Sequence, residues 1–270
     1  MAPQAAGSAL IGAGPGEAQE LLPWEAAATA ELFTQVGPSA ALRDGLAAFD
    51  AAVAYTRSPD LARNLAAAVP RVVVHDPRPP AGAGHAADWL ARPLSSLAVP
   101  RDEEPPTLVA TREERDAVAA LRRDLPDRFL AVHPGSGSPS KSWPADRFAF
   151  MLDALGVDGF LLIEGPADAE VAGALRTRKG AVAARALAPR LLGAIVAGAA
   201  AYVGNDSGVT HLAAAWGAPT VALFGPTDPG VWSPVGPRVT VVRVPEHRMD
   251  GIAVEAVLGA VAPLLAAARG

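Results

Sequence analysis

The chain has 270 residues, of which 50% are hydrophobic and 19% charged, with a formal net charge of −5 and no cysteine. This composition predicts an ordered globular protein and excludes disulfides, thiolate metal sites and a cysteine nucleophile. The acidic balance argues against non-specific nucleic-acid binding. The first residues lack the pattern of a signal peptide, and the longest apolar run, 191–203, is shorter than the roughly 20 residues of a membrane span. We therefore expect a cytoplasmic protein with at most peripheral membrane contact.

The first hundred residues predict a small α/β domain. The segment GAGPGE, residues 12–17, imitates a dinucleotide-binding fingerprint, but Glu17 stands where the third glycine belongs, so a glycine-rich turn is the better interpretation. The arginines of this region either line a groove for an anionic acceptor or form a solvated face, and they are Arg57, Arg63, Arg71 and Arg78. The expected strands are 9–12, 51–55 and 72–75, and the expected helices are 40–48 and 60–68.

Residues 99–107 concentrate charge and proline and predict a linker. Strands and helices alternate after it, which predicts right-handed βαβ units and a parallel, doubly wound sheet. A capping box of Thr111 and Glu114 is expected to open the first helix, which runs to about Asp124. The expected strands are 129–133, 160–164, one near 182, 201–203, 220–224 and 239–244. The expected helices begin at 144, 167, 190, 208 and 251, with a bend in the last one at Pro263.

The loop after the first strand of this region has the composition of a phosphate site. Residues 133–148 read HPGSGSPSKSWPADRF, in which glycines and hydroxyls such as that of Ser136 allow close approach of a ligand, and Lys141 adds a cation before a helix. The spacing is not that of a Walker A loop. Taken alone, the segment would be interpreted as a solvated loop, but a second loop of this kind at the same sheet edge favours a binding site.

That second loop, GNDSGVTH at residues 204–211, joins a buried strand directly to a helix. The Ser207 hydroxyl is expected to accept an amide of the first turn, so that the helix begins at Gly208. Free amides and the positive end of the helix dipole attract anions here, and His211 lies in the first turn. Because Asp206 would compete with a plain phosphate, we expect a ligand that carries both negative charge and hydroxyl groups.

Two other kinds of site are poorly supported. No carboxylate or third histidine stands at ligand spacing beside His133 and His211, and no D-x-D pair is present, so we expect no metal. No G-x-S-x-G elbow surrounds Ser136 or Ser207, which argues against a serine hydrolase.

Acidic residues follow the strand expected at 160–164. Glu164, Gly165 and Asp168 end this strand and face the same sheet edge as the two loops. A carboxylate here either binds ribose hydroxyls or simply starts the next helix. Both interpretations stay open.

Three segments resemble glycosyltransferase family 9, the ADP-heptose:lipopolysaccharide heptosyltransferases and their relatives. They are residues 133–155, residues 161–170 (LLIEGPADAE) and, above all, residues 203–236, where D-[ST]-G-x-x-H is followed by F-G-P-T-D-P. The resemblance covers the region after the linker and continues more weakly through residues 49–78.

The resemblance implies a GT-B architecture of two Rossmann-like domains. Residues 1–100 would form the acceptor side, residues 107–250 would bind the nucleotide sugar, and a helix in 251–270 would pack back toward the N-terminal domain. The implied reaction transfers a heptose-like sugar with inversion, without metal or cofactor, from a nucleotide-diphosphate sugar, foremost an ADP-sugar, to a lipopolysaccharide-type or other glycan or lipid-linked acceptor. The donor-binding residues that it implies are Ser136, Lys141, Asp206, Ser207, Gly208 and His211.

The start of the chain departs from the family pattern. Members begin with a strand, a Gly-Asp loop and a helix, and that aspartate is the expected general base. No Gly-Asp stands near the start here, so we expect a domain shortened by its first strand and helix, with Glu17 as a displaced equivalent or a wrongly assigned start codon as alternatives. The catalytic residue stays unidentified, and a second hypothesis is a non-catalytic relative that binds nucleotide sugar without a base.

Overall fold

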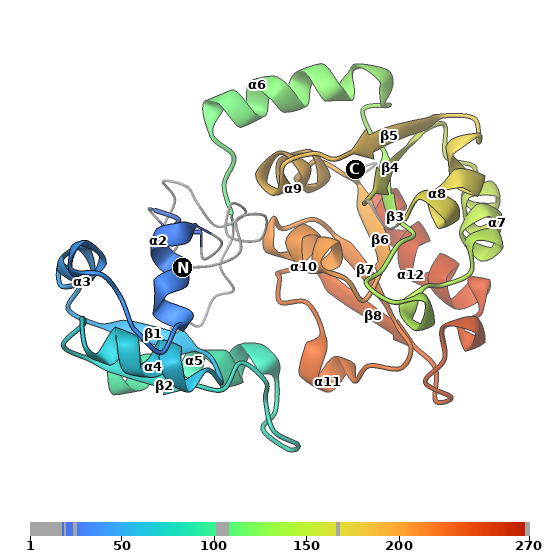
Figure 1. Ribbon diagram of the computed structural model, residues 1–270. Helices are drawn as coiled ribbons and strands as arrows, with labels where there is room; N and C mark the ends of the chain where they lie inside the picture. Colours follow the sequence, from blue (N-terminus) through green and yellow to red (C-terminus); the bar gives the residue numbers. More distant parts are fainter. Residues whose placement is uncertain (1–17, 19, 24–25, 101–107, 166–167, 268–270) are drawn as a thin grey trace. The chain divides into compact units, whose positions relative to one another are not determined.

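The computed structural model describes residues 18, 20–23, 26–100, 108–165 and 168–267 (Figure 1). These residues form two compact units, one before and one after residues 101–107. The expected strand at 9–12 and the turn at 12–17 lie outside the described residues. No helix among the described residues is long and apolar enough to cross a bilayer.

The first unit contains a two-stranded parallel sheet among its described residues. β1 (Ala52–Tyr55) pairs with β2 (Val72–His75), and α4 (Pro59–Ala66) connects the two strands. Ser58 caps α4 by accepting the amide of Leu61. The core consists of Leu32, Leu46, Ala54, Leu61, Leu65 and Val69. The other elements are α2 (Ala27–Ala30), the 3-10 turn η2 (Glu31–Phe33), α3 (Ala40–Leu46) and α5 (Ala86–Ser96).

Most expected elements of this unit are present. The strands at 51–55 and 72–75 and the helices at 40–48 and 60–68 are confirmed to within two residues at each end. Helix α5 was not expected. It contains Pro93 in its interior, and proline is a signal that normally ends a helix.

The second unit is built on a six-stranded, all-parallel sheet in the order β5-β4-β3-β6-β7-β8. Numbered along this unit, the order is 3-2-1-4-5-6, as in dinucleotide-binding Rossmann folds. The predicted doubly wound parallel sheet is therefore confirmed. The carboxyl ends of β3 and β6 flank the switch point, where open α/β sheets bind ligands. The strands are β3 (Leu130–His133), β4 (Phe160–Glu164), β5 (Ala181–Arg185), β6 (Ala201–Asn205), β7 (Thr220–Phe224) and β8 (Val239–Arg243).

Helices cover both faces of this sheet (Figure 1). Alternate strand residues point to opposite faces, so that Leu130 and Val132 pack with α7, α8 and α12, whereas Ala131 packs with α6, α9 and α10. Strands β4, β6 and β7 are buried throughout, which explains their unbroken apolar character. The helices are α6 (Arg112–Leu121), α7 (Ala145–Leu155), α8 (Ala169–Arg176), α9 (Pro189–Ala197), α10 (Gly208–Ala215), α11 (Pro229–Trp232) and α12 (Val254–Ala267), and the 3-10 turns are η3 (Arg122–Asp124), η4 (Pro139–Lys141) and η5 (Met249–Gly251).

The last helix starts later than expected. Residues 249–251 form the turn η5, so α12 begins at Val254 and continues past Pro263. Val257 and Val261 are fully buried in the core of the second unit. This helix is therefore part of the hydrophobic core that carries the sheet.

The predicted capping box is present at the start of α6. The Thr111 hydroxyl accepts the amide of Glu114, and a Glu114 carboxylate oxygen accepts the amide of Thr111. Arg190 of α9 donates to the same carboxylate, which joins two helices on one face of the sheet.

We expect Thr111→Ala to lower the free energy of unfolding by about 1 kcal/mol, because the first turn loses its side-chain acceptor. Urea denaturation measures this change. Thr111→Ser keeps the hydroxyl and should stay within about 0.5 kcal/mol of the parent chain. Equal losses in the two variants would contradict a role for the cap.

Candidate functional site

Asn205 joins the two loops at the switch point. Its side chain is fully buried at the end of β6. Its amide donates to the carbonyls of Pro134 and Gly135 at 2.8 and 3.2 Å. Its side-chain oxygen accepts the amide of Trp143 at 3.0 Å. Because all three partners belong to the loop after β3, one side chain fixes that loop against the start of α10.

Asp206 is the centre of a second set of contacts. Its Oδ2 accepts hydrogen bonds from Lys141 Nζ at 2.8 Å and from Thr227 Oγ1 at 2.7 Å. Its Oδ1 lies 4.0 Å from Nε2 of His211. The Asp206 side chain is 8% exposed, whereas those of Lys141 and His211 are 31% and 45% exposed. A buried carboxylate thus holds an ammonium group, and a solvent-accessible imidazole lies beside it.

Helix α10 begins at Gly208, as predicted, with Ser207 in the N-cap position. The prediction that the Ser207 hydroxyl caps this helix is wrong, since no side-chain cap hydrogen bond forms. The hydroxyl oxygen lies instead 3.2 Å from His133 Nδ1 and 3.2 Å from Thr210 Oγ1. The first amides of an α-helix have no acceptor within the helix, so they can bind a ligand. The space at Gly208 is open, because an added Cβ would meet no atom within 4 Å.

A buried pair that was not expected lies next to Ser207. His133 Nε2 is 2.9 Å from Asp168 Oδ2, and these residues are 3% and 6% exposed. The Asp168 carboxylate also accepts the amide of Gly165 at 2.8 Å. The hydrogen bond from His133 holds the pKa of Asp168 below its ordinary value, although burial acts in the opposite direction. The Asp168 carboxylate is therefore ionised at neutral pH, and it accepts hydrogen bonds from groups of the protein itself.

Glu164 is occupied by ion pairs. Its carboxylate accepts hydrogen bonds from Arg176 Nε at 3.0 Å and from Arg185 Nε at 3.3 Å. The hydrogen bond from Arg176 is the main reason why the pKa of Glu164 is lowered. These contacts disfavour ribose binding by Glu164, and Asp168, in the N-cap position of α8, forms no side-chain cap hydrogen bond with that helix.

Ser136 stands apart from the other candidates. Its hydroxyl donates to the carbonyl of Ser138 and lies 2.9 Å from the hydroxyl of Ser142, within the same turn. The structure thus brings Lys141, Asp206 and His211 into direct proximity. It connects the remaining candidates, Ser207 and Gly208, to them through the start of α10. Among the described residues no cluster of three or more His, Asp or Glu could hold a metal ion.

Several site residues were missed from the sequence. Asn205 had a signal, because an amide side chain at the end of a buried strand needs hydrogen-bond partners. Thr227 lies in the F-G-P-T-D-P segment, which carries the family resemblance but gives no role to the threonine. The pair of His133 and Asp168 had no local signal, since its members are 35 positions apart.

The arginines of the first unit are largely engaged with neighbours. Arg57 forms an ion pair with Asp76 at 2.7 Å, and Arg63 forms one with Asp60 at 2.7 Å. Arg71 donates to the carbonyl of Ser96. These contacts favour a paired, solvated surface over a groove of unpaired cations. Glu17 lies outside the described residues.

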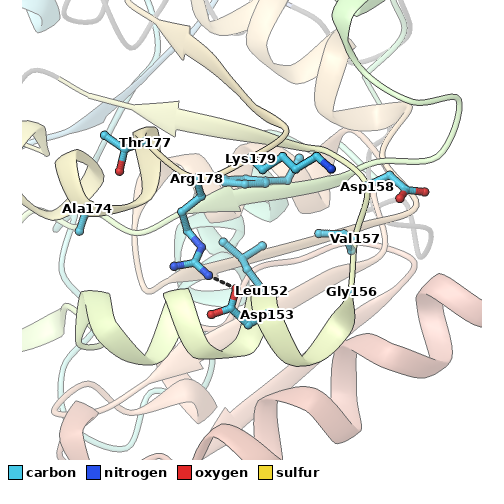
Figure 2. A pocket seen from close by; sticks show the side chains of 10 residues that line it. Leu152, Asp153, Gly156, Val157, Asp158, Ala174, Thr177, Arg178 and Lys179 are labelled. Carbon is cyan, nitrogen blue, oxygen red and sulfur yellow. Dashed lines mark hydrogen bonds and ion pairs between the residues drawn. The ribbon is translucent and has the colours of Figure 1, made fainter.

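A surface hollow of about 510 Å³ lies at the opposite edge of the sheet of the second unit. Its walls come from the last parts of α7 and α8 and from the turns that lead into β4 and β5, at the amino ends of these strands. Figure 2 shows Arg178 reaching the carboxylate of Asp153 across it. Lys179 and Asp158 also line the hollow, so its charges of both signs balance. We therefore do not assign the diphosphate-type site to this hollow.

The chain matches a family profile described as "Glycosyltransferase family 9 (heptosyltransferase)" over residues 87–259. It is 29% identical over 156 residues to lipooligosaccharide heptosyltransferase 2 of Haemophilus influenzae, a match that covers 54% of this chain and 44% of the relative. The matched region thus spans less than half of that relative's length.

Two solved Escherichia coli structures have a similar fold. One is ADP-heptose lps heptosyltransferase II, with a TM-score of 0.69, 20% identity and coverage of 85% of this chain and 81% of that one. The other is heptosyltransferase WaaC with ADP, with a TM-score of 0.64, 18% identity and coverage of 89% and 79%. These similarities confirm the predicted α/β fold class of the GT-B type with Rossmann-like units.

Gly135 and Gly137 form a matched pair for testing the packing of the loop after β3. An added Cβ at Gly135 would fall 1.9 Å from the carboxylate carbon of Asp168, whereas at Gly137 it would meet nothing within 4 Å. We expect Gly135→Ala to lower the free energy of unfolding by about 1–3 kcal/mol through overpacking. Gly137→Ala should have little effect. Similar denaturation midpoints for the two variants would refute the close approach to Asp168.

The lowered pKa of Asp168 predicts how stability depends on pH. The unfolded state binds this proton more readily, so the stabilisation is present above the ordinary value of 3.8 and is lost as the pH falls through the lowered pKa. Asp168→Asn should therefore flatten the loss of unfolding free energy between about pH 5 and pH 2. Asp124→Asn, at an exposed position, is the control. A parallel pH profile in the parent chain and Asp168→Asn would contradict the assignment.

Proposed function

The chain belongs to glycosyltransferase family 9, and from this premise we propose that it transfers a sugar from a nucleotide-diphosphate sugar to a glycan or lipid-linked acceptor. The donor is an ADP-linked, heptose-like sugar, and the acceptor is of the lipopolysaccharide type. The observation that carries the proposal is the convergence of Lys141 and His211 on Asp206, at the start of α10 and at the switch point of the sheet.

The electrostatics of this position suit a diphosphate. The start of α10 offers the backbone amides of Gly208 and Val209 and the positive end of the helix dipole. Lys141 has three N–H donors, of which Asp206 takes one, so two are left for phosphate oxygens. The negative charge of Asp206 is compensated by the same ammonium group and by the Thr227 hydroxyl. A phosphate therefore meets little net repulsion from the carboxylate.

The proposed ligand also carries the hydroxyl groups of its sugar, besides the diphosphate. Asp206 Oδ1 has His211 at 4.0 Å, and this acceptor can receive a sugar hydroxyl. The ADP bound by the related WaaC protein supports ADP as the nucleotide of the donor. We assign donor binding to residues 107–250 and the acceptor side to residues 1–100, in a cytoplasmic protein with at most peripheral membrane contact.

In the proposed reaction an acceptor hydroxyl oxygen attacks the anomeric carbon from the side opposite the diphosphate. The bond from that carbon to the phosphate oxygen breaks, and the nucleoside diphosphate leaves with the electron pair. The α10 amides, Lys141 and His211 stabilise the charge that develops on it. The acceptor proton passes to a carboxylate base, which is not identified among the described residues. A second hypothesis is a relative that binds the donor without transferring its sugar.

ADP binding tests the donor site. We expect ADP to raise the melting temperature of the parent chain, and Lys141→Gln to weaken binding roughly tenfold to a hundredfold, because a charged hydrogen bond to phosphate is lost. Isothermal titration measures the dissociation constants. Lys179→Gln, which removes a lysine from the hollow of Figure 2, should bind ADP like the parent chain. Unchanged binding by Lys141→Gln would exclude this site.

Turnover separates the two hypotheses. With ADP-heptose and a heptose-deficient lipopolysaccharide core as substrates, a transferase releases ADP and extends the acceptor. If Glu17 is the displaced base, Glu17→Gln should lower the rate by about 10²–10⁴-fold without weakening ADP binding. ADP binding without transfer or donor hydrolysis would favour the non-catalytic relative.

A further inference from the structure

A chain of polar contacts, each within hydrogen-bonding distance, runs through the start of α10. It begins at the Asp168 carboxylate and passes through both ring nitrogens of His133, at 2.9 and 3.2 Å. It continues from the Ser207 hydroxyl to Thr210 Oγ1 at 3.2 Å and ends at the backbone carbonyl of Asn205. The proposed function gives no role to His133, Asp168 or Thr210.

The hydrogen positions at the Thr210 end follow from chemistry. A carbonyl oxygen can only accept, so Thr210 gives its hydrogen to Asn205. The hydroxyl of Tyr202 lies 2.9 Å from Thr210 Oγ1 and also has the Ser207 side chain as a hydrogen-bond partner, and burial raises the pKa of Tyr202, so this phenol keeps its hydrogen and is a donor to these hydroxyls. The Thr210 oxygen is therefore an acceptor toward its remaining neighbour, Ser207.

The hydrogen positions at the Asp168 end are also restricted. An ionised carboxylate can only accept, so His133 carries a hydrogen on Nε2. If the ring is neutral, Nδ1 accepts the hydrogen of Ser207. If the ring is charged, Nδ1 donates to Ser207, and Ser207 passes its own hydrogen to Thr210. In both states the Ser207 hydroxyl donates its hydrogen to an atom of the protein. Toward a ligand it can therefore act only as an acceptor, through a lone pair.

We propose that His133 is a positioning residue that presents the Ser207 side chain to the ligand as a hydrogen-bond acceptor. Ser207 then recognises a hydroxyl group of the nucleotide sugar rather than a phosphate oxygen. A phosphate oxygen offers no hydrogen to such a group, whereas a sugar hydroxyl does. This inference rests on the proposed function and divides the site, with phosphate on the α10 amides and Lys141 and a hydroxyl on Ser207.

The ring of His133 is held firmly enough for this role. His133 is the last residue of β3 and is 3% exposed. Its partner Asp168 packs so closely on Gly135 and Gly165 that a Cβ on either glycine would lie within 3 Å of the carboxylate. The ring thus connects the loops after β3, β4 and β6, and in either state of the ring the hydrogen of Ser207 points at an acceptor of the protein before a ligand arrives.

Two substitutions of His133 separate its two contacts. In His133→Gln the amide nitrogen can replace Nε2 and keep Asp168, while the contact with Ser207 is lost. In His133→Asn the amide can replace Nδ1 and keep Ser207, while Asp168 is lost. We expect Ser207→Ala and His133→Gln each to weaken binding of ADP-heptose about three- to tenfold. The double variant should be no weaker than either one, and His133→Asn should lose less than His133→Gln.

Three probes identify the group that Ser207 binds, with dissociation constants measured by calorimetry for ADP-heptose, ADP and inorganic pyrophosphate. A loss in Ser207→Ala for ADP-heptose alone assigns the transferred sugar, and a loss for ADP-heptose and ADP but not pyrophosphate assigns the ribose. Equal losses for all three probes mean that Ser207 donates to phosphate, which would overturn the inference. Thr220→Val, which removes a buried hydrogen bond at the amino end of β7, is the control for general destabilisation.

The outcomes distinguish this inference from the proposed function. If the parent chain binds neither ADP nor ADP-heptose, the proposed function fails and this inference fails with it. If the parent chain binds both and the effects of His133→Gln and Ser207→Ala are additive, the role of His133 is overturned; if both effects are absent, the roles of His133 and Ser207 are overturned, and the proposed function stands in either case. Melting temperatures without ligand identify a variant that does not fold. In that case the three-probe series on Ser207→Ala still decides which group Ser207 binds.

Discussion

The candidate site depends on one constraint, which is that polar side chains buried at the switch point must find partners in the neighbouring loop. Asn205 is the clearest case, because its amide and its carbonyl oxygen both bond to the loop after β3. An amide left without these partners in the core would cost a few kcal/mol. The same side chain that satisfies this requirement also brings Lys141 within reach of Asp206. The same hydrogen bonds therefore stabilise the fold and assemble the site.

Both buried carboxylates of the site have a hydrogen-bond donor before any ligand arrives. Asp206 is buried and paired with Lys141, while Asp168 is buried and paired with His133. A buried carboxylate without a partner would be strongly destabilising, so each of these acids needs a donor from another loop. What is left facing solvent is the rest of the ammonium group, the His211 ring and the amides of α10. This remainder has the positive character that a diphosphate requires.

Periodicity predicted the architecture of the second unit because its strands are short, apolar and separated by helices with clear start signals, such as Thr111 and Ser207 in the N-cap positions. Residues 133–148 and 204–211 were placed at one sheet edge for the same reason. The predicted capping role of the Ser207 hydroxyl was wrong, because the His133 imidazole from another strand competes with the helix amide for this hydroxyl. Long-range pairs such as His133 with Asp168 depend on tertiary packing, which local patterns do not contain. Helix α5 was not predicted, because it contains Pro93 and proline normally ends a helix.

The contact between Gly135 and Asp168 has a consequence for how this loop can vary during evolution. The carboxylate fills the volume where a side chain at position 135 would stand. A larger residue at 135 is compatible with the fold only if position 168 shrinks at the same time, and that exchange would remove the acceptor that orients His133. Substitutions at positions 135 and 168 should therefore occur together. Sequences without glycine at 135 should also lack the histidine at 133.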